Sequence, residues 1–411
     1  MHRASQNQKE IAYKGNRQFS TFNLYMSRFH SYINTALTLI EKYKGDVPFP
    51  IFSKQFFSTQ KNYGSRDRKL ITHCCYCFFR TGHLLFGIAQ DKKIAAAFFL
   101  CSPTKNELLE NIAPQWNEAA AYSIEKKIQL LNTSGSVKNI FPWMEALSEG
   151  IEKEKFALSF LQQPDLFLRI RPGHKTAVQA KLETAGIEYS ILDGGALVLP
   201  NGSKIENIIE PDKEVVVQDL SSQRTADLLF EFNDLKKADC WDCCVASGGK
   251  SILLYDRFNS HIDLTVSDIR PAVLDELKYR FERAGIRNYY AFNADLSAPL
   301  IKAISFNLIV CDAPCTGSGT WGRTPEQLYF FKEKKIEQFA LLQQQIVSNI
   351  IPHLKKGGYL LYITCSVFKK ENEAMVDFIK ETSSLHLLNM ELLKGYEQKA
   401  DTMFVALFRN G

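Results

Sequence analysis

The sequence predicts an α/β protein whose C-terminal part forms a doubly wound, mostly parallel sheet, preceded by a small α+β module and an N-terminal helical domain. Three observations lead to this class. Short apolar runs alternate with helical patterns after residue 240, apolar residues recur every three or four positions between residues 27 and 134, and strand-like runs flank a Gly-Gly turn at 194–195. Strands that alternate with helices pair in parallel through right-handed crossovers, which gives a doubly wound sheet.

The expected domain boundaries follow these changes of pattern. We expect four segments: a flexible N-terminus over 1–20, a basic helical domain over 21–135, a small α+β module over 136–235 and the α/β domain over 236–411. Two or three folded domains are ordinary for a globular chain of 411 residues. In the α+β module we expect strands over 166–171, 188–192 and 196–199, a helix over 176–182, and a further helix over 221–232.

In the α/β domain, strands are predicted at 240–244, 262–266, 289–292, 306–311 and 359–364, with a terminal antiparallel pair at 385–393 and 404–408. The helix between the second and third strands is well marked, because Val273, Leu277, Phe281 and Ala284 share one face and Gly285 supplies a stop signal.

Composition excludes several classes of protein. With 45% apolar and 23% charged residues, the chain is neither mainly disordered nor fibrous. No uncharged apolar run approaches the ~18 residues of a membrane span, and the polar first twenty residues lack the apolar core of a secretory signal. We therefore expect a cytoplasmic protein without a membrane partner, whose ten cysteines are reduced thiols. Cys74 and Cys77 share a helix face and are predicted to pack in a core, so no metal is expected.

Positive charge is concentrated at the N-terminal end. Residues 1–80 contain 13 Lys and Arg against 4 Asp and Glu, a net charge of +9 in a chain whose total is +5. A basic end on a near-neutral body favours a polyanionic partner, with nucleic acid the first candidate. Charge alone also leaves open a solvated basic surface that binds nothing.

The first strand of the α/β domain runs into the glycine-rich segment 242–250, Asp-Cys-Cys-Val-Ala-Ser-Gly-Gly-Lys. Such a turn before a helix exposes backbone N–H groups to which a carboxylate or phosphate can bind. A P-loop is excluded because Cys244 stands where its first glycine is required, and the dinucleotide fingerprint G-x-G-x-x-G is absent.

Acidic residues follow the next strands in order. Asp268 ends the second strand, 20 residues after Gly248, where a carboxylate can accept hydrogen bonds from both ribose hydroxyls, and Asp295 follows the third strand, within reach of an adenine amino group. A nucleoside without phosphates, bound by a loop that accepts a carboxylate, describes S-adenosylmethionine. Any one of these residues alone is more typical of a turn or cap; their ordered series favours the cofactor.

Two cysteines follow the fourth and fifth strands, in Asp312-Ala-Pro-Cys315 and Tyr362-Ile-Thr-Cys365. Ligands of doubly wound sheets bind beyond the carboxyl ends of the strands, so these thiols would face each other beside the cofactor if the two strands are neighbours. A thiolate that adds to C6 of a pyrimidine makes C5 nucleophilic, and a second group can assist release of the product. A single cysteine at such a position is usually a buried apolar residue, but the pair favours C5 methylation.

These residues resemble the NOL/NOP/Sun family of RNA cytosine-C5 methyltransferases, which includes the bacterial RsmB type. The resemblance begins near Phe141 and covers about two-thirds of the chain. It is carried by the segments 217–223, 242–250, 312–321, 342–343, 356–358, 362–367 and 371–373. The chain departs from the family pattern at Val245, Ser247 and Asn307, and we expect activity to survive all three differences.

The resemblance implies a Rossmann-like class I S-adenosylmethionine methyltransferase domain, an RNA-facing α+β module and an N-terminal domain similar to NusB. It implies that Cys365 is the nucleophile, that Cys315 assists product release, and that Asp312 and Lys250 hold the target base. The cofactor positions it implies are Cys244, Val245, Ala246, Ser247, Gly248, Gly249, Lys250, Asp268, Asp295 and Asp312.

The expected protein is thus a monomeric RNA methyltransferase acting on ribosomal RNA, with tRNA left open as the substrate. Two other functions are less compatible with the sequence. Retention of both Cys315 and Cys365 disfavours a catalytically idle RNA-binding assembly factor. The threonine-cysteine motif and the preceding RNA-type module disfavour a DNA cytosine methyltransferase.

Overall fold

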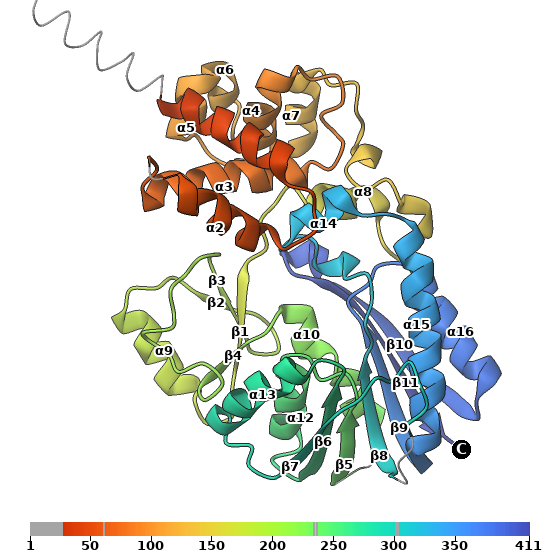
Figure 1. The fold of residues 1–411 in the computed structure, drawn as a ribbon. Coiled ribbons are helices and arrows are strands. Elements are labelled where there is room, and N and C mark those ends of the chain that lie inside the picture. The colour runs from red at the N-terminus through yellow and green to blue at the C-terminus, as the bar shows by residue number, and fades with distance from the viewer. Residues whose placement is uncertain (1–27, 61, 233–234, 236, 301–303) are drawn as a thin grey trace, which may run out of the picture. The chain divides into compact units, whose positions relative to one another are not determined.

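The computed structural model describes residues 28–60, 62–232, 235, 237–300 and 304–411, and it divides the chain into two compact units (Figure 1). Unit 1 extends to Pro142 and also includes Phe160–Gln162 and Thr324–Phe330. Unit 2 contains Trp143–Ser159, Gln163–Arg323 and Phe331–Gly411. The terminus predicted to be flexible, 1–20, lies outside the described residues. No helix in the described ranges is both long and apolar enough to span a membrane.

Unit 1 is helical, as predicted. Residues 28–42 are helical, and the helices that follow are α2 (Phe49–Thr59), α3 (Ser65–Arg80), α4 (Gln90–Cys101), α5 (Glu107–Ile112), α6 (Pro114–Glu118), α7 (Ile124–Leu131), the 3₁₀ turn η1 (Val137–Asn139) and the distant α14 (Pro325–Phe330). Aromatic packing holds α14 here, because the ring of Phe330 lies 5.3 Å from that of Tyr43, edge to face. Cys74, Cys75 and Cys77 are buried in this core.

The main sheet of unit 2 has the strand order β10-β11-β9-β8-β5-β6-β7. Its strands from β9 to β7 pair in parallel, and β10 and β11 add an antiparallel edge. The doubly wound sheet predicted from the sequence is therefore confirmed. The strands are β5 (Ala238–Asp242), β6 (Ile262–Asp268), β7 (Tyr289–Asn293), β8 (Phe306–Asp312), β9 (Leu354–Thr364), β10 (Leu385–Lys394) and β11 (Thr402–Asn410).

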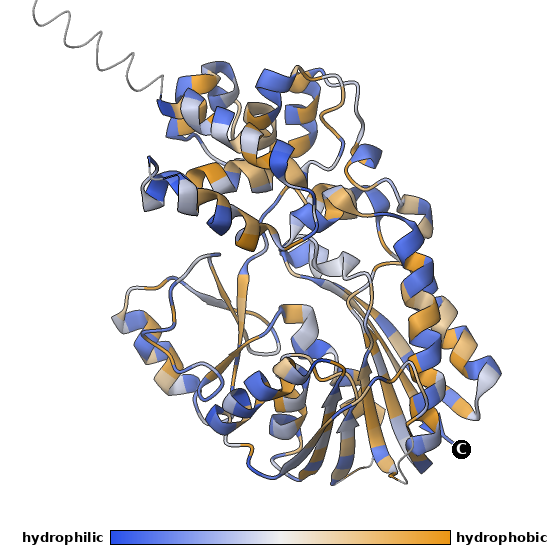
Figure 2. Ribbon diagram, in the orientation of Figure 1, coloured by the Kyte–Doolittle hydropathy of each residue, from blue (hydrophilic) through white to orange (hydrophobic). Residues whose placement is uncertain are grey.

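Helices cover both faces of this sheet. One apolar core joins the strands to α12 (Gly249–Arg257) and α13 (Pro271–Arg283), and a second joins the opposite face to α15 (Lys334–Ile350) and α16 (Glu373–Thr382). Figure 2 shows hydrophobic residues concentrated on the central strands. A strand that is buried on both faces has a continuous run of apolar residues, and these runs allowed the strands to be predicted from the sequence. Short 3₁₀ turns complete this part of the chain: η3 (Ser318–Thr320), η4 (Ile351–His353), η5 (Lys369–Glu371) and η6 (Gly395–Gln398).

The small module contains a four-stranded antiparallel sheet in the order β2-β3-β1-β4. Its elements are η2 (Met144–Ala146), α8 (Lys153–Ser159), β1 (Leu166–Ile170), α9 (Lys175–Thr184), β2 (Ser190–Ile191), β3 (Ala196–Leu199) and β4 (Val215–Val217). The sequence did not predict β4, which has only three residues. The single helix predicted over 221–232 is wrong: the structure has α10 (Leu220–Arg224) and α11 (Asp227–Phe232), interrupted at Thr225 and Ala226.

Candidate active site

The turn between β5 and α12 is shaped by two residues in the left-handed region. Gly248 has φ +79° and caps α12, and a Cβ at this position would lie 2.2 Å from Cδ1 of Leu277. Ala246 has φ 44°, and its N–H donates to the Asp268 carboxylate at 3.1 Å. Gly249 is open, since an added Cβ would meet nothing within 4 Å. The turn is thus a tight backbone cradle of the kind that accepts a carboxylate at a helix N-terminus.

Asp268 ends β6 beside this turn. Its carboxylate accepts hydrogen bonds from the backbone N–H of Arg270 at 2.9 Å and from Nε of the same residue at 3.0 Å. Burial pushes the pKa of Asp268 up, but the bonds from Arg270 and Ala246 outweigh burial and lower the pKa below its usual value. Asp268 is therefore a carboxylate at neutral pH, able to accept from ribose hydroxyls.

Asp295, the third acidic residue in the predicted series, is exposed after β7. It accepts hydrogen bonds from N and Oγ of Ser297, at 3.0 and 2.6 Å, which lower its pKa. Ile269, directly after Asp268, is 57% exposed and was not selected from the sequence. An exposed isoleucine next to the proposed ribose ligand offers the apolar contact that a purine ring requires.

Asp242, the last residue of β5, is buried beneath the turn. Ser251 donates to its Oδ2 at 2.6 Å, while Oδ1 has no hydrogen-bond partner among the described residues. Burial, together with nearby Asp312, raises the pKa of Asp242 to about 7. An unpaired buried acceptor at this point has the right chemistry to meet the ammonium group of an amino-acid ligand.

The structure brings the two predicted catalytic cysteines together. β8 and β9 are parallel neighbours with Asp312 opposite Ile363, so the loops that follow them diverge from one point of the sheet. Sγ of Cys315 lies 3.3 Å from Sγ of Cys365. The hydrogen bond to Cys365, and then burial, raise the pKa of Cys315 well above that of a free thiol. Cys315 is therefore held as a protonated thiol beside Cys365.

Lys250 and Asp312 form an ion pair at the same site, with Nζ and Oδ2 2.7 Å apart. Burial lowers the pKa of Lys250, but Asp312 and then Cys365 outweigh burial and raise it above the usual value. The ammonium group therefore stays charged and places a cation beside Cys365.

Both cysteine loops are joined by Glu371, which is fully buried. Its carboxylate accepts from the N–H of Thr316 at 2.8 Å and from Oγ1 of Thr316 at 2.6 Å, and from the hydroxyl of Ser366. Gln343 donates to it at 3.2 Å and to the carbonyl of Pro314 at 3.0 Å. Since Thr316 follows Cys315 and Ser366 follows Cys365, one side chain holds both loops. Burial raises the pKa of Glu371.

The sequence contained signals for these supporting residues without assigning them a role. Gln343 and Glu371 lie in segments that carry the family resemblance, but their contacts with Pro314 and Thr316 join distant parts of the chain. Trp321 and Phe368, aromatic residues that follow the two cysteines in the chain, are 2% and 0% exposed and pack edge to face, so they belong to the core. Asn307 accepts from the N–H of Asp239 at 2.7 Å, so its amide serves a structural role in the strand pair.

The sheet order, the cradle after β5 and the acidic residue at the end of β6 define a Rossmann-like methyltransferase fold. The comparisons with known proteins agree. The crystal structure of PH0851 has a TM-score of 0.67 at 18% identity and covers 93% of this chain and 98% of that one. The structure of NSun6 from Pyrococcus horikoshii with SFG has a TM-score of 0.56 at 16% identity, covering 67% and 96%. At these identities the likeness establishes the fold.

Sequence relatives specify the family further. Residues 228–408 match the family model described as 16S rRNA methyltransferase RsmB/F. The probable ribosomal RNA small subunit methyltransferase B of Synechocystis sp. is 27% identical over 55% of this chain and 52% of its own length. The ribosomal RNA small subunit methyltransferase B of Erwinia tasmaniensis is 25% identical over 78% and 83%. That of Proteus mirabilis is 29% identical over 58% and 56%, so the match spans about half of two of these relatives.

Residues 228–408 therefore form a methyltransferase domain of the RsmB/F family.

Proposed function

We propose that this protein transfers a methyl group from S-adenosylmethionine to C5 of a cytosine in ribosomal RNA. The observation that carries the proposal is the pair of thiols 3.3 Å apart at the ends of β8 and β9, beside the ion pair of Lys250 and Asp312. The covalent route that an unreactive pyrimidine C5 requires uses one thiol as the nucleophile, and a second thiol beside it can assist release of the product.

Cys365 acts as the nucleophile. Its sulfur, with the Lys250 cation nearby, adds to C6 of the ring and makes C5 electron-rich. S-adenosylmethionine, when bound, supplies an electrophilic methyl group for C5. The C5 proton then passes to a base from solvent, the C5–C6 double bond re-forms and the Cys365–C6 bond breaks. Cys315, a protonated thiol beside Cys365, assists this release by donating a hydrogen bond to the departing sulfur. Asp312 and Lys250 hold the polar edge of the base through their hydrogen-bonding groups.

The cofactor positions fit S-adenosylmethionine. The backbone turn from Cys244 to Gly249, which is open at Gly249, suits the amino-acid part, and Oδ1 of Asp242, which has no partner among the described residues, suits its ammonium group. The Asp268 carboxylate suits the ribose hydroxyls, and Ile269 suits one face of the adenine. Asp295, which is exposed, remains proposed as the partner of the adenine amino group. No part of this assignment requires a phosphate, in keeping with the absence of a P-loop sequence.

Ribosomal RNA is proposed as the substrate because the matching family model and the curated relatives are described as acting on the RNA of the small ribosomal subunit. The target base must be unstacked or single-stranded for Cys365 to reach C6. A tRNA substrate is an outcome of the experiment below.

The test measures methyl transfer from S-adenosylmethionine labelled in its methyl group to ribosomal RNA and, separately, to tRNA from cells that lack the protein. Bisulfite sequencing then locates 5-methylcytosine. We expect ribosomal RNA to be labelled at one cytosine. Cys365→Ala should abolish labelling while RNA binding persists. If the wild type binds RNA but labels neither RNA, the protein is an RNA-binding assembly factor and the proposal fails.

A covalent trap tests the two thiol roles. Cys315→Ala should accumulate a protein–RNA adduct on denaturing gels, because methyl transfer still occurs but release is impaired. Multiple-turnover activity should fall by about 10²–10³-fold, in the range of a lost acid–base group. An adduct that forms in Cys365→Ala and not in Cys315→Ala would reverse the assignment.

A further inference from the structure

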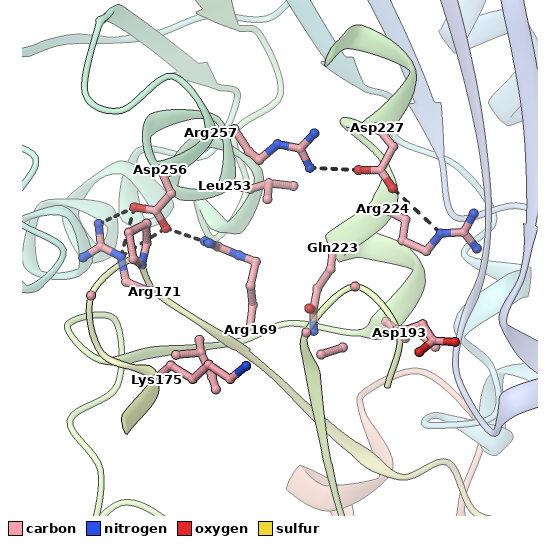
Figure 3. A pocket seen from close by; sticks show the side chains of 17 residues that line it. Arg169, Arg171, Lys175, Asp193, Gln223, Arg224, Asp227, Leu253, Asp256 and Arg257 are labelled. Atoms are coloured by element: carbon pink, nitrogen blue, oxygen red, sulfur yellow. Dashed lines mark hydrogen bonds and ion pairs between the residues drawn. The ribbon is translucent and has the colours of Figure 1, made fainter. Parts of the chain in front are cut away.

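A cavity of about 510 Å³ lies within unit 2, between the small module and helices α10 and α12 (Figure 3). The proposed methyl transfer makes no use of it. Its volume falls in the range of ligand sites, about 300–1,000 Å³. It is lined by five cationic and three anionic side chains: Arg169, Arg171, Lys175, Arg224 and Arg257, with Asp193, Asp227 and Asp256.

Two of the three carboxylates form ion pairs with arginines that line the cavity. Asp256 pairs with both Arg169 and Arg171, at 2.6 and 2.7 Å, which joins strand β1 to helix α12. Asp227 pairs with Arg257 at 2.9 Å and lies 3.9 Å from Arg224 (Figure 3). Arg224 also pairs at 2.9 Å with Glu391, which does not line the cavity, so the excess of positive charge on this wall comes from the two arginines that share Asp256.

Arg169 has an unused donor. Its Nη1 bonds to Asp256 and its Nε to Gln218, but Nη2 is buried and has no partner among the described residues. The whole side chain is 11% exposed. A buried donor without an acceptor carries an uncompensated desolvation cost, and an anionic oxygen in the cavity that Arg169 lines would remove it.

Lys175 supplies a cation that lacks an acidic partner among the described residues. It is the first residue of α9, a helix of ten residues with no acidic side chain in its first turn and no side-chain cap, and no ion pair to Lys175 occurs in the part of the chain that is described. Next to it, Gly173 leaves the backbone open, since an added Cβ would meet nothing within 4 Å. Asp193 lies at the turn between β2 and β3 and repels an anion there, so the favourable position is on the Lys175 side.

We propose that this cavity binds a backbone phosphate of the RNA substrate through Arg169 and Lys175. The assignment rests on the proposed function, because α12 links the two sites: Lys250 is in its first turn, and Leu253 and Asp256 line the cavity. Six residues of helix span about 9 Å, a distance bridged by about three nucleotides at the 3.4 Å rise of one strand. The contact positions the strand and reads no base.

The test compares Lys175→Ala with Lys204→Ala, which removes an exposed lysine of the same module that does not line the cavity. Binding of a single-stranded RNA oligonucleotide is measured between 50 and 200 mM KCl. Lys175→Ala should weaken binding about 3–10-fold at the lower salt and reduce the slope of log Kd against log salt by about 0.7, the value for one lost phosphate contact. Lys204→Ala should change neither quantity.

Arg169→Lys keeps the charge but removes Nη2. It should weaken RNA binding while leaving the salt slope unchanged, and its thermal unfolding shows whether the pair with Asp256 has survived. In steady-state methyl transfer, Lys175→Ala should raise the KM for RNA and leave kcat within about twofold.

Equal binding by Lys175→Ala and Lys204→Ala would overturn the assignment. So would Lys175-dependent binding of inorganic phosphate without any effect on RNA, since the cavity would then serve a free anion. If the wild type transfers no methyl group but Lys175→Ala still lowers the salt slope, the proposed function fails and the phosphate site stands.

Discussion

Two groups of thiols lie near the same ends of the central strands, and they differ in their surroundings more than in their spacing. The sulfurs of Cys243, Cys244 and Cys311 lie within 4.8 Å of one another, and those of Cys315 and Cys365 are 3.3 Å apart. Cys243 and Cys244 follow β5, and Cys311 is the residue before the last one of β8. Cys315 follows β8, and Cys365 follows β9. Proximity of sulfur atoms is common to both.

The difference lies in access and in polar partners. Cys243 and Cys311 are buried among apolar side chains of the sheet core. Hydrogen bonds from Cys243 and Cys244 lower the pKa of Cys311 to about 6, but its fully buried thiol cannot reach a substrate carbon. Both cysteines of the second group are partly exposed, as is Cys244 of the first, so the polar partners separate the groups more clearly than access does. In the second group, the Lys250 cation interacts with Cys365, and Glu371 interacts with Cys315. A reactive cysteine is thus recognised by its accessibility and its charged neighbours.

The largest difference in methyl-transfer activity is expected between two variants that each lack one thiol, one from each group. Cys365→Ala should lower methyl transfer by at least about 10³-fold, because the covalent route is lost. Cys311→Ala should leave methyl transfer within about threefold and lower the free energy of unfolding by about 1–2 kcal/mol, the cost of a small cavity in a packed core. Initial rates and urea unfolding measure both. Comparable losses of activity in the two variants would show that the buried group takes part in the chemistry.

A smaller loss of activity is expected from substitution of Glu371, whose carboxylate accepts hydrogen bonds, among the described residues, only from the loops of Cys315 and Cys365 and from Gln343. In Glu371→Gln, an amide N–H replaces an acceptor that faces the donors of Thr316 and Gln343, so the free energy of unfolding should fall by about 1–3 kcal/mol. Loosening both cysteine loops should lower kcat about 10–100-fold without changing the KM for S-adenosylmethionine.

Glu373→Gln is the matched control, because Glu373 belongs to the same segment but accepts from Ser148 and from the N–H of Glu149. Its kcat should stay within about twofold. Equal kcat losses in the two variants would mean that the segment as a whole is needed and that Glu371 has no special role.

The strands and the approach of the two catalytic cysteines could be predicted from the sequence, whereas the contacts that support the cysteines could not. Strands such as β8 were predicted because burial on both faces leaves an apolar run, and the two cysteines were predicted to approach because strand ends converge. The start of β9 at Leu354 was missed, since Lys355 and Lys356 interrupt the apolar pattern. The bonds of Glu371 to Thr316 span 55 residues of sequence and depend on how two loops pack, which no local pattern encodes.

Asp242 adjoins both groups of thiols. It precedes Cys243 in the chain, and its carboxyl group lies beside Lys250 and Asp312. Its pKa is about 7 in the folded protein against an ordinary 3.8. The neutral form is therefore favoured by folding, and its contribution to stability is complete below about pH 4 and lost as the pH rises through 7. Asp242→Asn mimics the neutral acid at every pH.

The variant should accordingly gain stability over the wild type between pH 5 and pH 8, by roughly 4 kcal/mol at most. Urea unfolding of both proteins at several pH values measures this difference. The gain arises because the wild type must bury a charge whose Oδ1 has no partner. Added S-adenosylmethionine should reduce the gain if its ammonium group pairs with that charge. A stability difference that is the same at pH 5 and pH 8 would show that Asp242 is charged throughout and that the pair of Lys250 and Asp312 does not set its state.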